Sequence, residues 1–216
     1  MFRYLTAIGA ASALLAGASL LAPAAPALAD APVAFSAQAV PGAPQVRSGD
    51  YRLDKSHAKI HWSVWHFGFS EYTGEFVDFD ASLTLDGANP EHSRLSVTVA
   101  TPSIATNDGA LDTHLKSGDF FDVAAHPRAT FTSTAITRTG ADTALVTGDF
   151  TLRGQTHPLT LNVTFNKADN NMAGIYTAGF SASGTVRRSL YGMTYGLPAV
   201  GDEISLRISG EFNLAN

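Results

Sequence analysis

The residues whose types and spacing could do chemistry form three groups. They are the histidines His57, His61 and His66, the segment with Asp112, His114 and Lys116, and the adjacent arginines Arg187 and Arg188. Converging histidines can hold zinc, a histidine oriented by a carboxylate can act as a base, and guanidinium groups bind phosphate.

The three histidines do not predict a metal site. Side chains alternate along a strand, so His57 and His61 share the wet face with Lys59, whereas His66 falls on the apolar register. Two ligands on one face are too few for a structural zinc site. We expect His57 and His61 at the surface. We expect His66 either to be buried with a backbone hydrogen bond or to touch a ligand head group at a cavity mouth.

The Asp112–His114 pair admits two interpretations. A small hydrolase or isomerase would use His114 as its base, but it also needs a nucleophile and an oxyanion hole, and the G-x-S-x-G elbow is missing. The structural interpretation pairs Asp112 with Lys116 at i,i+4 on a short helix, with Asp119 capping the next segment. The prediction is a protein without a catalytic residue, with the enzyme kept as the alternative.

The two arginines follow a predicted strand. They either bind a phosphate head group or are solvated charges that need no explanation. The loop at 191–198 (YGMTYGLP) adds two tyrosines and two glycines. It could form a lid over an opening, because functional segments are often loops of this kind.

Alternation of apolar and polar residues with period two dominates the chain from Tyr51 and predicts antiparallel strands with one apolar face. The eight segments that show it are Ala58–Val64, Val77–Leu85, Leu95–Thr101, Ala129–Ala135, Ala144–Leu152, Leu159–Phe165, Tyr176–Val186 and Ile204–Phe212. One segment, Asp108–Lys116, breaks this pattern and predicts a short helix between the third and fourth strands, capped by Thr106 or Asn107.

Consecutive antiparallel strands favour closure, because closure removes exposed edges. The fold class is therefore all-β, an eight-stranded antiparallel barrel, which at this size is either filled by side chains or holds one small ligand. Large side chains that could fill it are Trp62, Phe79, Phe131, Phe150 and Phe180. Small residues recur on the same register and favour a cavity: Ala81, Ala129, Ser133, Gly148, Ala178, Ala182, Gly184 and Gly210.

The first 29 residues of the chain predict export. Arg3, an apolar run over 5–21 and Ala27-Leu28-Ala29 match a cleavable signal peptide at 1–29, and the alternative is a membrane anchor. Residues 30–50 are rich in Pro, Ala, Gly and Ser and are expected to be a flexible linker. Residues 51–216 then form one domain.

Charge and cysteine content exclude several classes. The formal net charge is −5, which argues against nucleic acid, since that ligand requires a basic surface. The chain has no cysteine, so disulfides, thiolate zinc, iron–sulfur clusters and a cysteine nucleophile are excluded.

Ordered motifs give a resemblance. They are Tyr51-x-Leu53-Asp54-x-x-His57, Asp112-x-His114-Leu115-Lys116-Ser117-x-Asp119-Phe120-Phe121-Asp122, and Gly148-Asp149-Phe150-Thr151-Leu152-x-Gly154. From about Tyr51 to Leu214 the chain resembles the YceI-like family. The resemblance implies a lipocalin-like barrel in the bacterial periplasm that holds a polyisoprenoid, such as a polyprenyl phosphate or a quinone tail. Two departures are Lys116, where the family usually has Arg, and the segment at 187–192, which matches only loosely.

These observations predict a periplasmic carrier with an isoprenoid lipid in the barrel and no cofactor or metal. The apolar tail is expected to contact Trp62, Val64, Phe79, Phe131, Phe150, Phe180, Ala182 and Gly184. The head group is expected near His66, His114, Lys116, Arg187 and Arg188. A barrel with a filled core that binds nothing, serving in stress response, stays as a third interpretation. A transient contact with a membrane or membrane protein and a homodimer are both compatible with the sequence.

Overall fold

The described part of the chain is residues 46–215 of a computed structural model. The predicted signal peptide and most of the predicted linker lie outside these residues. The last two residues of that linker, Gly49 and Asp50, already belong to the first strand, so the folded domain begins slightly earlier than expected. Among the described residues, no helix is long and apolar enough to cross a membrane.

Within residues 46–215 the fold is one ten-stranded antiparallel sheet with one short α-helix. The elements are β1 (Gly49–His66), β2 (Ser70–Phe76), β3 (Phe79–Leu85), β4 (Arg94–Ala100), β5 (Ile104–Ala105), α1 (Gly109–Lys116), β6 (Arg128–Arg138), β7 (Thr143–Leu152), β8 (Gln155–Asn170), β9 (Tyr176–Arg187) and β10 (Glu203–Leu214). Single 3-10 turns lie at 90–92, 101–103 and 188–191.

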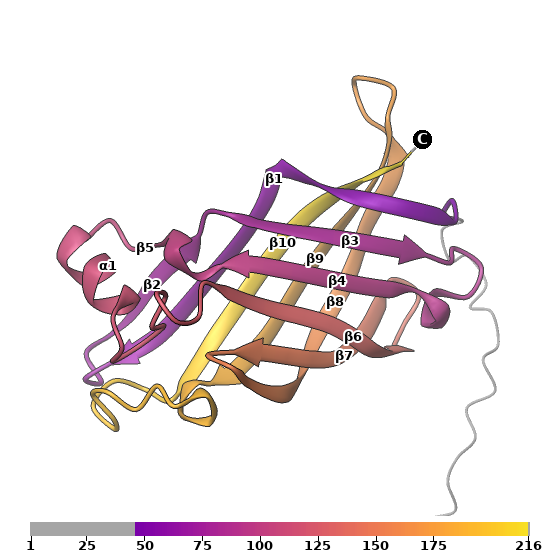
Figure 1. Ribbon diagram of the computed structural model, residues 1–216. Coiled ribbons are helices and arrows are strands. Elements are labelled where there is room, and N and C mark those ends of the chain that lie inside the picture. The colour runs from indigo at the N-terminus through magenta and orange to yellow at the C-terminus, as the bar shows by residue number, and fades with distance from the viewer. Residues whose placement is uncertain (1–45, 216) are drawn as a thin grey trace, which may run out of the picture. The chain divides into compact units, whose positions relative to one another are not determined.

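The sheet closes into a barrel because β1 pairs with β10, from Tyr51↔Leu214 to Ser63↔Ser205. The ring order is β1-β3-β4-β6-β7-β8-β9-β10, and these are the eight strands that the alternation predicts (Figure 1). The predicted closed eight-stranded barrel is confirmed. Two strands outside the ring were not predicted: β2 pairs with the second half of β1, and β5 pairs with β2.

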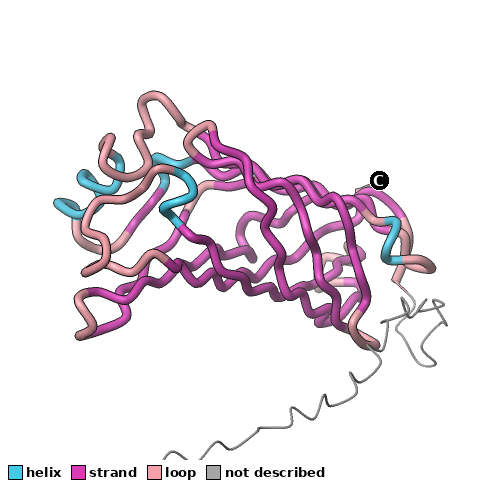
Figure 2. The backbone as a smooth tube through the Cα atoms, turned by 90° about the horizontal axis from the view of Figure 1, so that it is seen from below, coloured by secondary structure: helices cyan, strands magenta, loops and turns pink. Residues whose placement is uncertain are grey.

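The two ends of the barrel differ. At the end that we call the helix end lie α1, the β1–β2 connection and the long β9–β10 connection at 188–202. At the end that we call the turn end, short connections join β3 to β4, β6 to β7 and β8 to β9 (Figures 1 and 2).

The helix end is filled by side chains. Trp62 and Val64 pack with Ile104 and with Leu115 of α1. Glycines here give no free space: a Cβ at Gly148 would lie 2.6 Å from the Phe131 ring. A Cβ at Gly184 would likewise lie 2.7 Å from Leu161. The expectation that small inward residues leave room for a ligand is therefore wrong for Gly148 and Gly184.

Bulges change which residues face inward. Along β6, Ala129, Phe131 and Ser133 are buried, but the pairing with β7 shifts between Ser133 and Ala135. An extra residue in one strand turns the following side chains to the opposite face. After the shift, Ile136 and Arg138 line the interior, whereas Ala135, expected on the apolar register, is exposed.

The predicted helix is confirmed as α1, but its predicted cap is wrong. The carboxylate of Asp108 accepts hydrogen bonds from the backbone N–H groups of Ala110 and Leu111, at 2.9 and 3.2 Å. An aspartate at this position satisfies donors that the first helical turn leaves unpaired. Thr106, one of the two expected caps, instead donates to Asp112.

We expect Asp108→Ala to lower the free energy of unfolding by about 1 kcal/mol, because the first turn of α1 loses its acceptor. Asp108→Asn is the matched control and should lose little, since asparagine caps helices equally well. Urea unfolding followed by circular dichroism measures both. Equal stability of Asp108→Ala and the unmodified protein would contradict the assigned cap.

Candidate ligand cavity

A cavity of about 670 Å³ occupies the turn-end half of the barrel. This volume is in the range of pockets that enclose a small-molecule ligand. Its wall is mostly apolar and comes from all eight ring strands: Leu53, Ile60, Phe79, Ala81, Leu83, Leu85, Leu95, Val97, Ile136, Ala144, Val146, Leu161, Val163, Phe165, Phe180, Ala182, Ile208, Gly210 and Phe212.

The cavity persists because no inward side chain in this half spans the tube. Phe165, Phe180 and Phe212 stack edge to face on one wall, with ring centroids 5.6 and 6.0 Å apart. Small residues such as Ala81 and Ala182 line the remaining wall. Inward side chains such as Leu95 and Val163 are only partly buried, because no other side chain covers them in an unfilled interior. The wall therefore presents apolar surface that a ligand could cover.

The rim at the turn end carries the polar groups of the cavity. Ser48 and Asp142 lie there together with Arg138 of β6. The Ser48 hydroxyl accepts from the Gly87 backbone N–H at 2.9 Å, which ties the start of the described chain to the β3–β4 connection. Polar groups at one rim and apolar groups along the wall suit an amphipathic ligand.

Tyr51 also holds the first described residues to this rim. Its hydroxyl donates to the Arg47 carbonyl at 2.7 Å, and the Arg47 guanidinium lies 4.2 Å from the centre of the Tyr176 ring. Burial, with a smaller contribution from Tyr176, raises the pKa of Tyr51 to about 12. The Tyr51 phenol is therefore neutral and stays a hydrogen-bond donor across the physiological range.

Three of the eight residues expected to contact the tail line this cavity: Phe79, Phe180 and Ala182. The other five, Trp62, Val64, Phe131, Phe150 and Gly184, do not line it, and they pack in or next to the filled helix-end core. The Trp62 indole N–H is buried with no partner among the described residues.

The five residues expected near the head group lie at the helix end, away from this cavity. They are His66, His114, Lys116, Arg187 and Arg188, and none of them lines it. His66 is exposed beyond the last buried position of β1, so its expected place on a buried face is wrong. The polar rim is at the opposite end of the barrel.

Arg188 is buried, with 2% of its surface exposed. Its guanidinium donates to the carbonyls of Met193, Tyr195, Val200 and Gly201 at 2.7–2.9 Å. Burial lowers the pKa of Arg188, partly offset by Asp202, but an arginine keeps its charge at any ordinary pH. The side chain organises the β9–β10 connection and has little capacity left for a phosphate.

The connection held by Arg188 is not a lid over the cavity. Tyr191 and Met193 are 3% and 4% exposed and belong to the helix-end core. The Tyr191 ring packs against Phe150 and His157, with centroids 5.4 and 5.2 Å apart. The expected lid is therefore part of the packing that closes this end.

Asp112 and His114 do not form a catalytic pair. Asp112 accepts from the Thr106 hydroxyl, whereas His114 Nε2 lies 2.9 Å from Asp119. The His114 ring stacks between Phe120 and Tyr195, with centroids 5.0 and 4.8 Å away. The expected ion pair between Asp112 and Lys116 is also missing among the described residues.

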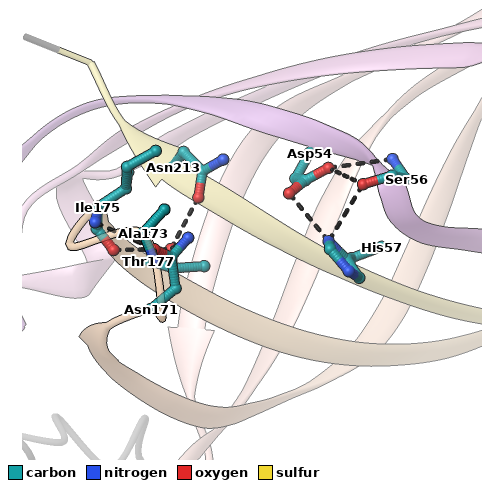
Figure 3. Close-up of polar contacts among 8 residues, drawn as sticks. All are labelled: Asp54, Ser56, His57, Asn171, Ala173, Ile175, Thr177 and Asn213. Atoms are coloured by element: carbon teal, nitrogen blue, oxygen red, sulfur yellow. Dashed lines mark hydrogen bonds and ion pairs between the residues drawn. The ribbon is translucent and has the colours of Figure 1, made fainter.

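A second Asp–Ser–His group lies in the bulge of β1 (Figure 3). Asp54 accepts from Ser56 and lies 2.9 Å from His57 Nδ1, and the Ser56 hydroxyl lies 3.2 Å from that same nitrogen. A catalytic triad needs the acid and the nucleophile on opposite ring nitrogens, so this group is not one. Asp54, His57 and Glu211 are the one set of three potential metal ligands in residues 46–215, and none of these three lines the cavity.

Arg138 lies on the cavity wall although it was not predicted there. A readable signal was the change of apolar register from odd to even positions between Phe131 and Ile136. Such a change predicts a bulge and places Arg138 inward.

A closed eight-stranded barrel with an apolar cavity and a polar rim defines a lipocalin-like barrel of the ligand-cavity type. Residues 51–212 match the model of the YceI-like domain, and the chain belongs to the YceI-like family. A UPF0312 protein of Pseudomonas putida is 41% identical over 169 residues, which cover 77% of this chain and 88% of that protein.

Two solved structures share the fold. BcnA of Burkholderia cenocepacia is 23% identical with a TM-score of 0.68, covering 74% of this chain and 98% of BcnA. A polyisoprenoid binding domain from Saccharophagus degradans, implicated in plant cell wall breakdown, is 12% identical with a TM-score of 0.56. That likeness covers 78% of this chain and all of the Saccharophagus domain.

We expect Arg188→Met to lower the free energy of unfolding by about 3 kcal/mol or more, because buried carbonyl groups lose their donors. Arg187→Met is the matched control: its side chain is 63% exposed and pairs with Asp202 at 3.4 Å, so the loss should stay within about 0.5 kcal/mol. Thermal and urea unfolding measure both. Equal effects of the two substitutions would show that Arg188 does not hold the β9–β10 connection in place.

We expect the pKa of His57 to lie above its ordinary 6.5, because a hydrogen bond to Asp54 favours the charged ring. Hydrogen bonds from Ser56 and His57 lower the pKa of Asp54 to about 2. The stabilisation from His57 is present below pH 6.5 and is lost as pH rises through its raised pKa. The stabilisation from Asp54 is present above its ordinary 3.8 and is lost as pH falls toward 2.

An NMR titration of the His57 ring checks this expectation. In Asp54→Asn the pKa of His57 should fall, and in Asp149→Asn, a change on β7, it should stay as in the unmodified protein. A His57 pKa that does not respond to Asp54→Asn would refute the pairing.

Proposed function

We propose that this protein is a periplasmic carrier that holds a polyisoprenoid or a similar long apolar lipid in the turn-end cavity. The observation that carries the proposal is the apolar cavity of about 670 Å³ inside a closed barrel. Each methylene that leaves water contributes about 0.8 kcal/mol. An isoprenoid tail can therefore bind through burial alone, without a specific polar contact along its length.

The family supports this proposal from a second direction. The Saccharophagus domain that shares the fold is described as polyisoprenoid binding, and this chain belongs to the YceI-like family by its sequence. The two groups that the alternative enzyme would use have separate partners: Thr106 donates to Asp112, and Asp119 pairs with His114. Binding is therefore the activity that the geometry supports best.

Export fits the carrier. The motif at 1–29 would deliver the chain to the periplasm as a signal peptide, and a carrier there would bring apolar lipid across an aqueous space. A transient contact with a membrane or a membrane protein would load and unload it. The ligand requires no cofactor or metal in this proposal, and a homodimer stays a prediction.

The direct test fills the cavity. Ala182 lines the wall between its paired neighbours Val163 and Ile208 on the adjacent strands. Ala182→Trp should therefore lower the amount of bound isoprenoid at least tenfold while the barrel still folds. Ser183→Trp, on the exposed outer face of the same strand, is the matched control. Gly184→Phe is unsuitable, because even a Cβ there would lie 2.7 Å from Leu161.

Both variants and the unmodified protein would be purified from a periplasmic fraction and analysed by native mass spectrometry and organic extraction, with circular dichroism to confirm folding. The proposal predicts isoprenoid in the unmodified protein and in Ser183→Trp only. Full lipid content in folded Ala182→Trp would overturn the proposal. So would an unmodified protein that is purified without isoprenoid and binds none when isoprenoid is added.

A further inference from the structure

Arg138 is the one Lys or Arg side chain on the cavity wall within residues 46–215. It lies at the last position of β6 and is partly buried. The bulge after Ser133 turns it inward, because without the extra residue position 138 would face outward. A charged group on an apolar wall is costly unless it is paired, so its presence there calls for a partner.

The described residues leave most of the Arg138 donors available. Its Nη2 donates to the Ala141 carbonyl at 3.1 Å, and this is the one side-chain hydrogen bond of Arg138 within residues 46–215. No carboxylate of these residues lies within ion-pair distance of it, although Asp142 lies on the same rim. Because a guanidinium has five N–H donors, Arg138 can still receive acceptor oxygens from a ligand.

The two arginines expected near the head group are engaged elsewhere, at the opposite end of the barrel. Arg188 spends its donors on four backbone carbonyls, and Arg187 pairs with Asp202 on the outer surface at the helix end. Near Arg138 the Thr143 hydroxyl accepts from the Thr139 hydroxyl at 2.9 Å, and a hydroxyl carries no positive charge. Arg138 is therefore the cation on this wall with donors left for a ligand.

We propose that Arg138 binds the oxygen-bearing head of the lipid at the turn end, with the tail directed toward the helix-end core. This inference rests on the proposed function and adds the orientation and the residue that selects the head. The shared chemistry is a hydrogen-bond acceptor oxygen, which a phosphate and a quinone carbonyl both present. Asp142 places a negative charge on the same rim and opposes a phosphate more than a neutral carbonyl.

The test compares three lipids of similar length: a polyprenyl phosphate, a long-chain isoprenoid quinone, and squalene, a hydrocarbon without oxygen. Arg138→Met keeps a similar side-chain length and removes the donors. It should weaken binding of the oxygenated lipids about tenfold or more, because hydrogen bonds from charged groups are the stronger ones, and leave squalene binding unchanged. Arg187→Met, at the opposite end, is the matched control and should change none of the three.

Each outcome has a defined meaning, with melting temperature as the check of folding. Loss for the phosphate, the quinone or both, with squalene retained, supports the inference and identifies the head. Equal loss for all three, or no loss for any, overturns it, as does an effect of Arg187→Met equal to that of Arg138→Met. Failure of the unmodified protein to bind any of the three would instead refute the proposed function.

Discussion

The width of an eight-stranded tube is the constraint on which the rest of the structure depends. Backbone pairing around the ring fixes that width, so the inward side chains decide whether the interior is solid or hollow. At the helix end, Trp62 packs with Leu115 of α1 in one buried cluster, and Phe131 and Tyr191 belong to a second. At the turn end, alanines such as Ala81 and Ala182 are too small to fill the tube, and hydrogen bonding between strands prevents the wall from collapsing onto them. The apolar cavity results because large inward side chains fill the helix end, whereas small ones line the turn end.

Register shifts are the second determinant, because they decide which chemistry meets the interior. In β6, one extra residue exchanges the inward and outward faces and brings Arg138 to the wall. In β1, the bulge between Asp54 and Lys59 places Asp54, Ser56 and His57 in a hydrogen-bonded group away from the cavity wall. Polar groups that could bind a ligand thus lie on different sides of the barrel wall, and only those that face inward can contact a ligand in the cavity.

The sequence predicts the fold well because alternation is a local signal. All eight ring strands and α1 are legible from short windows, since each needs only one dry and one wet face. The position of the helix cap is not legible in the same way, because Thr106 and Asn107, the expected caps, are as well suited by residue type as Asp108, which the structure uses.

The candidate site is less predictable, because its residues depend on partners distant in the chain or on a shifted register. Arg188 is identified as a clamp only when the carbonyls at 193–201 fold back onto it. His66 falls on the apolar register by counting, but the barrel wall has already ended there. The end at which the cavity opens also depends on which half of the tube is filled. The filling of each half depends on the inward side chains of all eight ring strands together.

The pairing of β1 with β10 has a consequence for how this protein is made. The first and last strands of the domain are neighbours, so the ring stays open until the final dozen residues, Glu203–Leu214, are present. Until then, β1 and β9 each present an unpaired edge, and such edges recruit other chains. Contacts that join the two termini also form slowly, because they span nearly the whole domain. A nascent or truncated chain is therefore the form most in need of a chaperone.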